Sequence, residues 1–163
     1  MKGYISDYTE ECSSQLFGEA DFPDEWLEND VFSPCEFFLC KIDLSVFGGN
    51  LLDKKGYMYI FIDMPSTIKK AKPILRFCAD EPDACTDFNE GYFEEEYEAK
   101  SITEATNGVG EEVVVNEEVG SEVVLFSLGS ENIPEELGIE SLKIVIDKAT
   151  LLKHDYSAAH LSF

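Results

Sequence analysis

Basic residues are scarce in this sequence. Only 12 Lys and Arg stand against 34 Asp and Glu, and the formal net charge is −22. A negative field of this size repels phosphate backbones and anionic lipid headgroups, so we expect no nucleic-acid partner and no membrane association. The same field attracts basic proteins and divalent cations. Charge also keeps a protein soluble, and solubility alone is the other explanation of the imbalance.

Long apolar runs are missing as well. No stretch approaches the roughly 18 apolar residues of a transmembrane helix. The first residues, Met1–Cys12, lack the apolar centre of a secretory signal peptide. We therefore expect a cytoplasmic protein. Its five cysteines are expected to be reduced thiols, because disulfides are rare in that compartment.

Signatures of catalysis are absent too. The sequence contains no Gly-x-Ser-x-Gly motif and no phosphate-binding loop. A Cys–His catalytic pair needs a positioned base, and the two histidines, His154 and His160, both lie near the C-terminus. Acidic pairs are so frequent here that no single pair points to a reaction. We predict no catalytic residue and no cofactor, and we expect that the protein is not an enzyme.

Metal-ligand patterns are equally weak. Cys35 with Cys40, and Cys78 with Cys85, could supply four thiolates, but their spacings are wider than those of structural zinc sites. Acidic residues crowd positions 80–90, yet the Asp-x-Asp-x-Asp-Gly turn of a calcium loop is missing. We predict no metal site.

What the sequence does contain is typical of a folded domain. Hydrophobic residues make up 44% of its 163 residues, with 12 Phe and 7 Tyr, which is typical of a chain that buries a core. We expect a single domain over residues 1–163. The acids are concentrated: residues 77–142 hold nineteen of the 34, with Lys100 as the only base.

Short apolar or alternating segments predict a series of strands. In Tyr57–Asp63 both alternating faces are apolar, so this strand should be covered on both sides. Tyr92–Ile102 alternates aromatic and acidic residues and is expected to be an edge strand with Glu94, Glu96 and Glu98 facing solvent. The other predicted strands are Phe37–Leu44, Pro73–Cys78, Val113–Val115, Glu122–Leu128 and Leu142–Ile146.

The remaining segments predict turns and little helix. Ile5, Tyr8 and Cys12 would share one face of a short amphipathic helix within residues 1–16. Ala149–His154 is expected to form one helical turn. A turn is expected at Gly48–Asn50 and a loop over Thr103–Glu112. Trp26, Phe32, Phe37 and Tyr59 are expected in the core, and a ligand groove is their alternative role.

Two parts of the sequence resemble each other. EFFLCKIDL at Glu36–Leu44 corresponds to EVVLFSLGS at Glu122–Ser130, and YMYIFID at Tyr57–Asp63 corresponds to SLKIVID at Ser141–Asp147. The offsets are 86 and 84 residues, so the spacing within each pair differs by only two. A long internal period indicates one structural unit used twice. We therefore predict a mainly β fold, α+β at most, with few short helices and a duplicated antiparallel strand unit at about 36–63 and 122–147.

Several short motifs follow one another in the order found in one bacterial family. They are Phe17-Gly18, Phe22-Pro23, Trp26, the run Phe38–Ser45, the run Gly56–Phe61 and the tail Leu151–Ser157. Together with their spacing, they make the chain similar to a divergent and shortened member of the YwqG-like family of bacterial proteins. Glu19 and Lys41 depart from the usual glycine and glutamine of that pattern. The resemblance implies a duplicated β fold, and it brings no catalytic residues, because the family has no established activity.

The charge pattern leads to a hypothesis about function. We expect an acidic protein-interaction module of the immunity type that binds a basic partner through residues 77–122. The candidate binding residues are Asp83, Asp87, Glu94, Glu96 and Glu98. The alternative is a small-molecule-binding protein or an enzyme that uses a cleft between the two repeats.

Overall fold

The computed structural model describes residues 1–49, 51–104 and 110–163. It is mainly β, as predicted, with three short α-helices among these residues. The strands are β1 (Lys2–Asp7), β2 (Gln15–Leu16), β3 (Ala20–Phe22), β4 (Glu36–Asp43), β5 (Tyr57–Asp63), β6 (Lys72–Cys78), β7 (Ala84–Thr86), β8 (Lys100–Thr103), β9 (Glu112–Val119), β10 (Glu122–Gly129), β11 (Ser141–Asp147) and β12 (His160–Ser162). The helices are α1 (Asp24–Glu28), α2 (Leu44–Phe47) and α3 (Lys148–Leu152).

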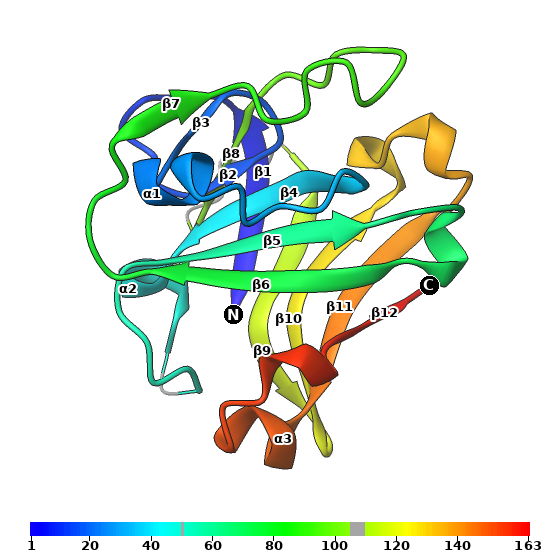
Figure 1. The fold of residues 1–163 in the computed structure, drawn as a ribbon. Coiled ribbons are helices and arrows are strands. Elements are labelled where there is room, and N and C mark those ends of the chain that lie inside the picture. The colour runs from blue at the N-terminus through cyan, green and yellow to red at the C-terminus, as the bar shows by residue number, and fades with distance from the viewer. Residues whose placement is uncertain (50, 105–109) are drawn as a thin grey trace.

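Ten of these strands form one antiparallel sheet. Their order is β12-β11-β10-β9-β1-β8-β2-β4-β5-β6, and the remaining two, β3 and β7, pair with each other. The end strands β6 and β12 also contact one another, so the sheet curls until it is nearly closed (Figure 1). Between the strands lie 3-10 turns at Ile68–Lys70, Ser130–Asn132, Glu135–Leu137 and Tyr156–Ala158. No helix in the described ranges is long and apolar enough to cross a membrane.

The predicted duplicated strand unit is present as two hairpins. β4 pairs with β5 from Glu36 opposite Asp63, and β10 pairs with β11 from Glu122 opposite Asp147. Each hairpin has one register shift, which leaves Leu39 as an extra residue in β4 and Leu125 in β10. These two bulges are 86 residues apart, which is the offset between the similar segments Glu36–Leu44 and Glu122–Ser130. Each hairpin is extended by one more antiparallel strand, β6 or β12.

The strand β5 separates two apolar clusters, as its sequence predicted. Met58, Ile60 and Ile62 belong to the main core inside the curled sheet. The alternate residues, Tyr57, Tyr59 and Phe61, belong to a smaller aromatic cluster on the other face. Trp26, Phe32 and Phe88 pack against that smaller cluster. Phe37 and Tyr59 are buried in the two clusters, as predicted, whereas Trp26 and Phe32 are only partly buried against the smaller one.

The expected N-terminal helix is wrong. Residues Lys2–Asp7 form β1, which lies in the middle of the sheet between β8 and β9. Gly3 and Ile5 point to the buried side, with period two rather than the helical period. The absence of a Cβ at Gly3 leaves room for Ile102 and Val113, which lie on the two neighbouring strands.

The expected edge strand at Tyr92–Ile102 is also wrong. Regular pairing starts only at Lys100, and β8 is an interior strand. Tyr92 and Phe93 are consecutive, yet both pack on the core. An extended strand points successive side chains to opposite faces, so the backbone has to turn here. The strand β12 was not predicted. The turn expected at Gly48–Asn50 and the loop expected at Thr103–Glu112 lie partly outside the described residues.

Candidate functional site

A concave surface on one side of the molecule is lined by acidic side chains. Its volume is about 550 Å³. Its walls come from the residues after β1, from the turn before β3, and from the segment that joins β7 to β8. Among the described residues that line it there is no Lys, Arg or His. We call it the acidic cavity, and its carboxylates are those of Glu10, Glu19, Asp87, Glu90, Glu95, Glu96 and Glu98.

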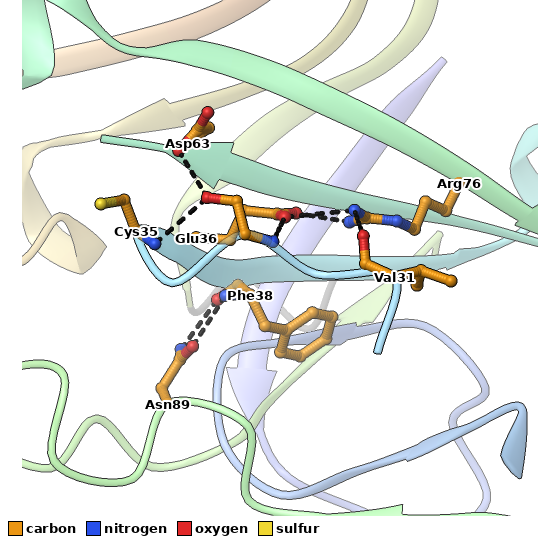
Figure 2. A network of polar contacts seen from close by, with 8 residues as sticks. Val31, Cys35, Glu36, Phe38, Asp63, Arg76 and Asn89 are labelled. Atoms are coloured by element: carbon orange, nitrogen blue, oxygen red, sulfur yellow. Dashed lines mark hydrogen bonds and ion pairs between the residues drawn. The ribbon is translucent and has the colours of Figure 1, made fainter. Parts of the chain in front are cut away.

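The side chain of Asn89 anchors one wall of the acidic cavity to the sheet. The short strand β2 pairs with β4 only at Cys40 and Lys41 and does not reach Phe38. The Asn89 carboxamide takes that place: its Oδ1 accepts from the Phe38 N–H at 2.7 Å, and its Nδ2 donates to the Phe38 carbonyl at 2.8 Å. Figure 2 shows these two bonds side by side. They give hydrogen-bond partners to the buried N–H and carbonyl of Phe38, which would otherwise have none in the sheet.

Aromatic rings anchor the same wall further along. The rings of Tyr92 and Phe93 lie 5.3 and 5.1 Å from that of Phe37, measured between centroids. The ring of Tyr97 lies 5.3 Å from that of Phe93 and 5.7 Å from that of Phe17. Aromatic pairs at such distances stabilise the fold by more than the burial of their surface area alone. The rings therefore hold the backbone in place while the glutamates between them stay exposed.

The carboxylate of Glu136 holds the far end of the segment between β7 and β8. It accepts a hydrogen bond from the backbone N–H of Glu94 at 3.2 Å and another from the hydroxyl of Tyr97. Burial, together with the bond to Glu136 and its charge, raises the pKa of Tyr97 to about 12. Residues 87–98 form this wall of the acidic cavity, and we call it the acidic wall. It is held at Asn89, at the aromatic rings and at Glu136.

The structure distributes the five predicted binding residues unequally. Asp87, Glu96 and Glu98 line the acidic cavity. Glu94 is exposed beside it but does not line it. Asp83 lines neither wall and instead bonds to the start of α1: its Oδ1 accepts from the backbone N–H of Asp24, the first residue of that helix, at 2.8 Å.

Sequence reasoning missed the opposite wall. Glu10 and Glu19 lie about 70 residues or more before the segment that they face, and nothing in their local sequence indicates that contact. The turn that places Glu19 depends on Gly18, whose φ is +74°. A Cβ at Gly18 would lie 2.4 Å from the backbone nitrogen of Ala99, so only glycine allows this close approach.

A smaller cavity of about 220 Å³ adjoins the acidic cavity. The two share Tyr8, Glu10, Glu19 and Cys85 in their linings. Lys41, in the middle of β4, also lines the smaller one and is the only base among its described lining residues. We call this space the Lys41 cavity; its other lining residues are Cys12, Ser13, Gln15, Ala20, Asp21, Tyr57 and Glu81.

Lys41 is held on an aromatic surface. Its Nζ lies 4.3 Å from the ring centroid of Tyr57, a cation–π distance. The Tyr57 hydroxyl donates to Glu81 at 2.9 Å. Burial lowers the pKa of Lys41, and the carboxylates of Asp21, Glu81 and Asp43 act in the opposite direction.

The five cysteines are all free thiols. Cys40 is buried within β4, and burial raises the pKa of its thiol well above the ordinary value. Cys85 is exposed and lines both cavities. In the part of the chain that the structure describes, no group of three or more His, Cys, Asp or Glu side chains is arranged to hold a metal ion.

Comparison with known proteins adds no relative. No protein-family model matches the chain, and no curated protein or solved structure matches it significantly. The resemblance to the YwqG-like family stays a prediction from the motifs quoted above. The candidate site is therefore defined by its own geometry: a 550 Å³ acidic cavity beside a smaller one that is lined by Lys41.

Proposed function

We propose that this protein is an interaction module that binds a basic protein partner, and that the acidic cavity receives the partner's Arg or Lys side chains. The observation that carries the proposal is the lining itself, with seven carboxylates and no base among its described residues. A concave surface of one charge sign concentrates ligands of the opposite sign and raises their association rate. A volume of about 550 Å³ is in the range of ordinary ligand pockets.

The anchoring of the acidic wall supports this role. Asn89, Tyr92 and Tyr97 each make a hydrogen bond to another part of the molecule. A wall fixed in this way loses little conformational freedom on binding, which favours affinity. Five of the seven carboxylates, those of Asp87, Glu90, Glu95, Glu96 and Glu98, are therefore presented by a preformed wall.

The wider assignment is part of the same proposal. We propose an immunity-like role in the cytoplasm, which the acidic surface and the five free thiols support. Membership of the YwqG-like family is proposed on the sequence motifs alone. The alternative, a cleft between the two repeats, has less support: Lys41 and Tyr57 of the first repeat line the Lys41 cavity, but no residue of 122–147 is among those that line either cavity.

The test uses fluorescently labelled acetyl-hexaarginine amide as the basic probe. We expect it to bind at low salt and to weaken steeply as ionic strength rises. The triple variant Glu95→Gln, Glu96→Gln, Glu98→Gln should bind on the order of tenfold more weakly. The matched control removes the same charge from exposed residues that do not line the cavity: Glu117→Gln, Glu135→Gln, Glu140→Gln.

Equal weakening in the two triple variants would overturn the proposal, because the probe would then respond to net charge and not to the cavity. Absence of binding to the wild-type protein at low salt would overturn it as well. Circular dichroism of each variant checks that the sheet is intact.

A further inference from the structure

Among the described residues, the ammonium group of Lys41 has no hydrogen-bond acceptor. The residue is 9% exposed, and within the described part of the chain its Nζ makes no hydrogen bond or ion pair. A lysine ammonium carries three donors, and because Lys41 lines the open Lys41 cavity, these donors are available to a ligand there. The ring of Tyr57 at 4.3 Å compensates for only part of the lost hydration. The side chain therefore presents unused donors to the Lys41 cavity.

The surroundings restrict what can bind there. Asp21 and Glu81 line the same cavity, and Glu10 and Glu19 line the boundary with the acidic cavity. A simple anion that approached Lys41 would meet these carboxylates and be repelled. A simple cation would be attracted by the carboxylates but would leave the Lys41 ammonium without an acceptor. The site accordingly suits a ligand that carries one anionic group close to several cationic groups.

We infer that Lys41 binds the C-terminal carboxylate of a basic polypeptide segment whose Arg or Lys side chains occupy the adjoining acidic cavity. This inference rests on the proposed function and specifies its partner: a protein that ends in basic residues. The four shared lining residues place the two cavities side by side, so one extended ligand can reach both. The terminal carboxylate takes the Lys41 end, and the preceding residues run along the carboxylates of the 85–99 segment.

The carboxylate group is the feature that a test can change without altering the rest of the probe. Acetyl-hexaarginine with a free C-terminal carboxylate carries one additional negative charge, so its net positive charge is one unit lower than that of the C-terminal amide. A purely electrostatic acidic surface therefore binds the amide more tightly. A charge-assisted hydrogen bond from Lys41 reverses this order, and we expect the free acid to bind on the order of tenfold more tightly than the amide.

Variants assign the preference to Lys41. Lys41→Gln should lose it and bind the amide more tightly than the acid. Lys41→Arg should keep it, because the guanidinium is also a charged donor. Lys143→Gln is the matched control, since Lys143 is exposed on β11 and lines neither cavity. The acid-to-amide ratio in the wild-type protein needs no variant and decides the inference even if a Lys41 variant fails to fold.

The outcomes separate this inference from the proposed function. If both probes bind with the salt dependence described above but the amide is equal or tighter, the C-terminal carboxylate site is wrong and the basic-partner function stands. If neither probe binds, both are wrong. If acetyl-arginine with a free carboxylate binds as tightly as the hexapeptide acid, the ligand is a small zwitterion and the polypeptide assignment is overturned.

Discussion

Arg76 and Glu36 form an ion pair that packs against the smaller aromatic cluster. The guanidinium donates to both carboxylate oxygens of Glu36, at 2.5 and 3.1 Å, and lies 4.6 Å from the ring centroid of Phe32 and 4.7 Å from that of Phe61. The Glu36 side chain is 1% exposed and that of Arg76 15%. Figure 2 shows the pair together with the Val31 carbonyl, which accepts a further bond from Arg76.

Glu36→Gln should destabilise the fold by about 3 kcal/mol, because it leaves the shielded guanidinium without its counter-charge. Urea unfolding measures the change. Glu118→Gln is the matched control: the Glu118–Lys148 pair has a similar distance, 2.6 Å, but side chains 44% and 40% exposed. Its removal should cost less than about 1 kcal/mol. Equal effects of the two substitutions would contradict the importance of burial.

The hairpins β4–β5 and β10–β11 could be predicted because their signal is local. In β5 both alternating faces are apolar. The two hairpins also have similar sequences, and each has a bulge at the equivalent position, Leu39 and Leu125. The central strand β1 could not be predicted in this way. Only Gly3 and Ile5 are buried in it, and glycine carries no hydrophobic signal. Its place depends on pairing with β8, about a hundred residues later.

The acidic cavity was predictable only on one side. Asp87, Glu96 and Glu98 stand in an acidic region that the composition already marks. Glu10 and Glu19 reach the cavity because β1 and β2 both pair with β8, which directly follows the acidic segment. That contact is a property of the sheet order, and no local pattern encodes it. The sequence pattern predicts a strand for the exposed glutamates, whereas in the structure aromatic anchors in a turning backbone present them.

Asn89→Ala should loosen the acidic wall. The Phe38 N–H and carbonyl would lose both partners, and each unsatisfied group costs about 1–3 kcal/mol when buried. We expect faster hydrogen exchange at the Phe38 amide and through residues 87–98, and weaker binding of acetyl-hexaarginine amide. Asn132→Ala serves as the control for exchange at Phe38, because its amide bonds to the Glu111 side chain and not to the backbone of β4. Unchanged protection at Phe38 would refute the anchoring role.

Gly56→Ala should be far more damaging than Gly120→Ala. Both residues have positive φ, +83° and +64°, so both substitutions carry a left-handed backbone penalty of about 1–2 kcal/mol. At Gly56 a Cβ would also lie 2.0 Å from the carbonyl oxygen of Cys78, whereas at Gly120 nothing lies within 4 Å. The difference between their unfolding free energies therefore isolates the clash between the start of β5 and the end of β6. Similar values for the two variants would show that the strands can separate there at little cost.

Stability in alkaline solution should depend on Tyr97. Its pKa is raised to about 12 in the folded protein, by burial and by Glu136, from an ordinary value of about 10. Between these values the phenol is protonated when folded and ionised when unfolded. Its contribution to stability is therefore complete below pH 10 and is lost as the pH rises to about 12.

Tyr97→Phe removes this titration, so stability should fall less steeply with pH in the variant than in the wild-type protein between pH 10 and 12. Urea unfolding at several pH values measures the slopes, and the absorbance of tyrosinate follows the ionisation directly. Tyr57→Phe is a second case, because burial and the bond to Glu81 raise the pKa of Tyr57 to about 12 as well. If wild type and Tyr97→Phe lose stability in parallel, the hydroxyl of Tyr97 does not hold its proton on folding, and the contact with Glu136 does not anchor the acidic wall.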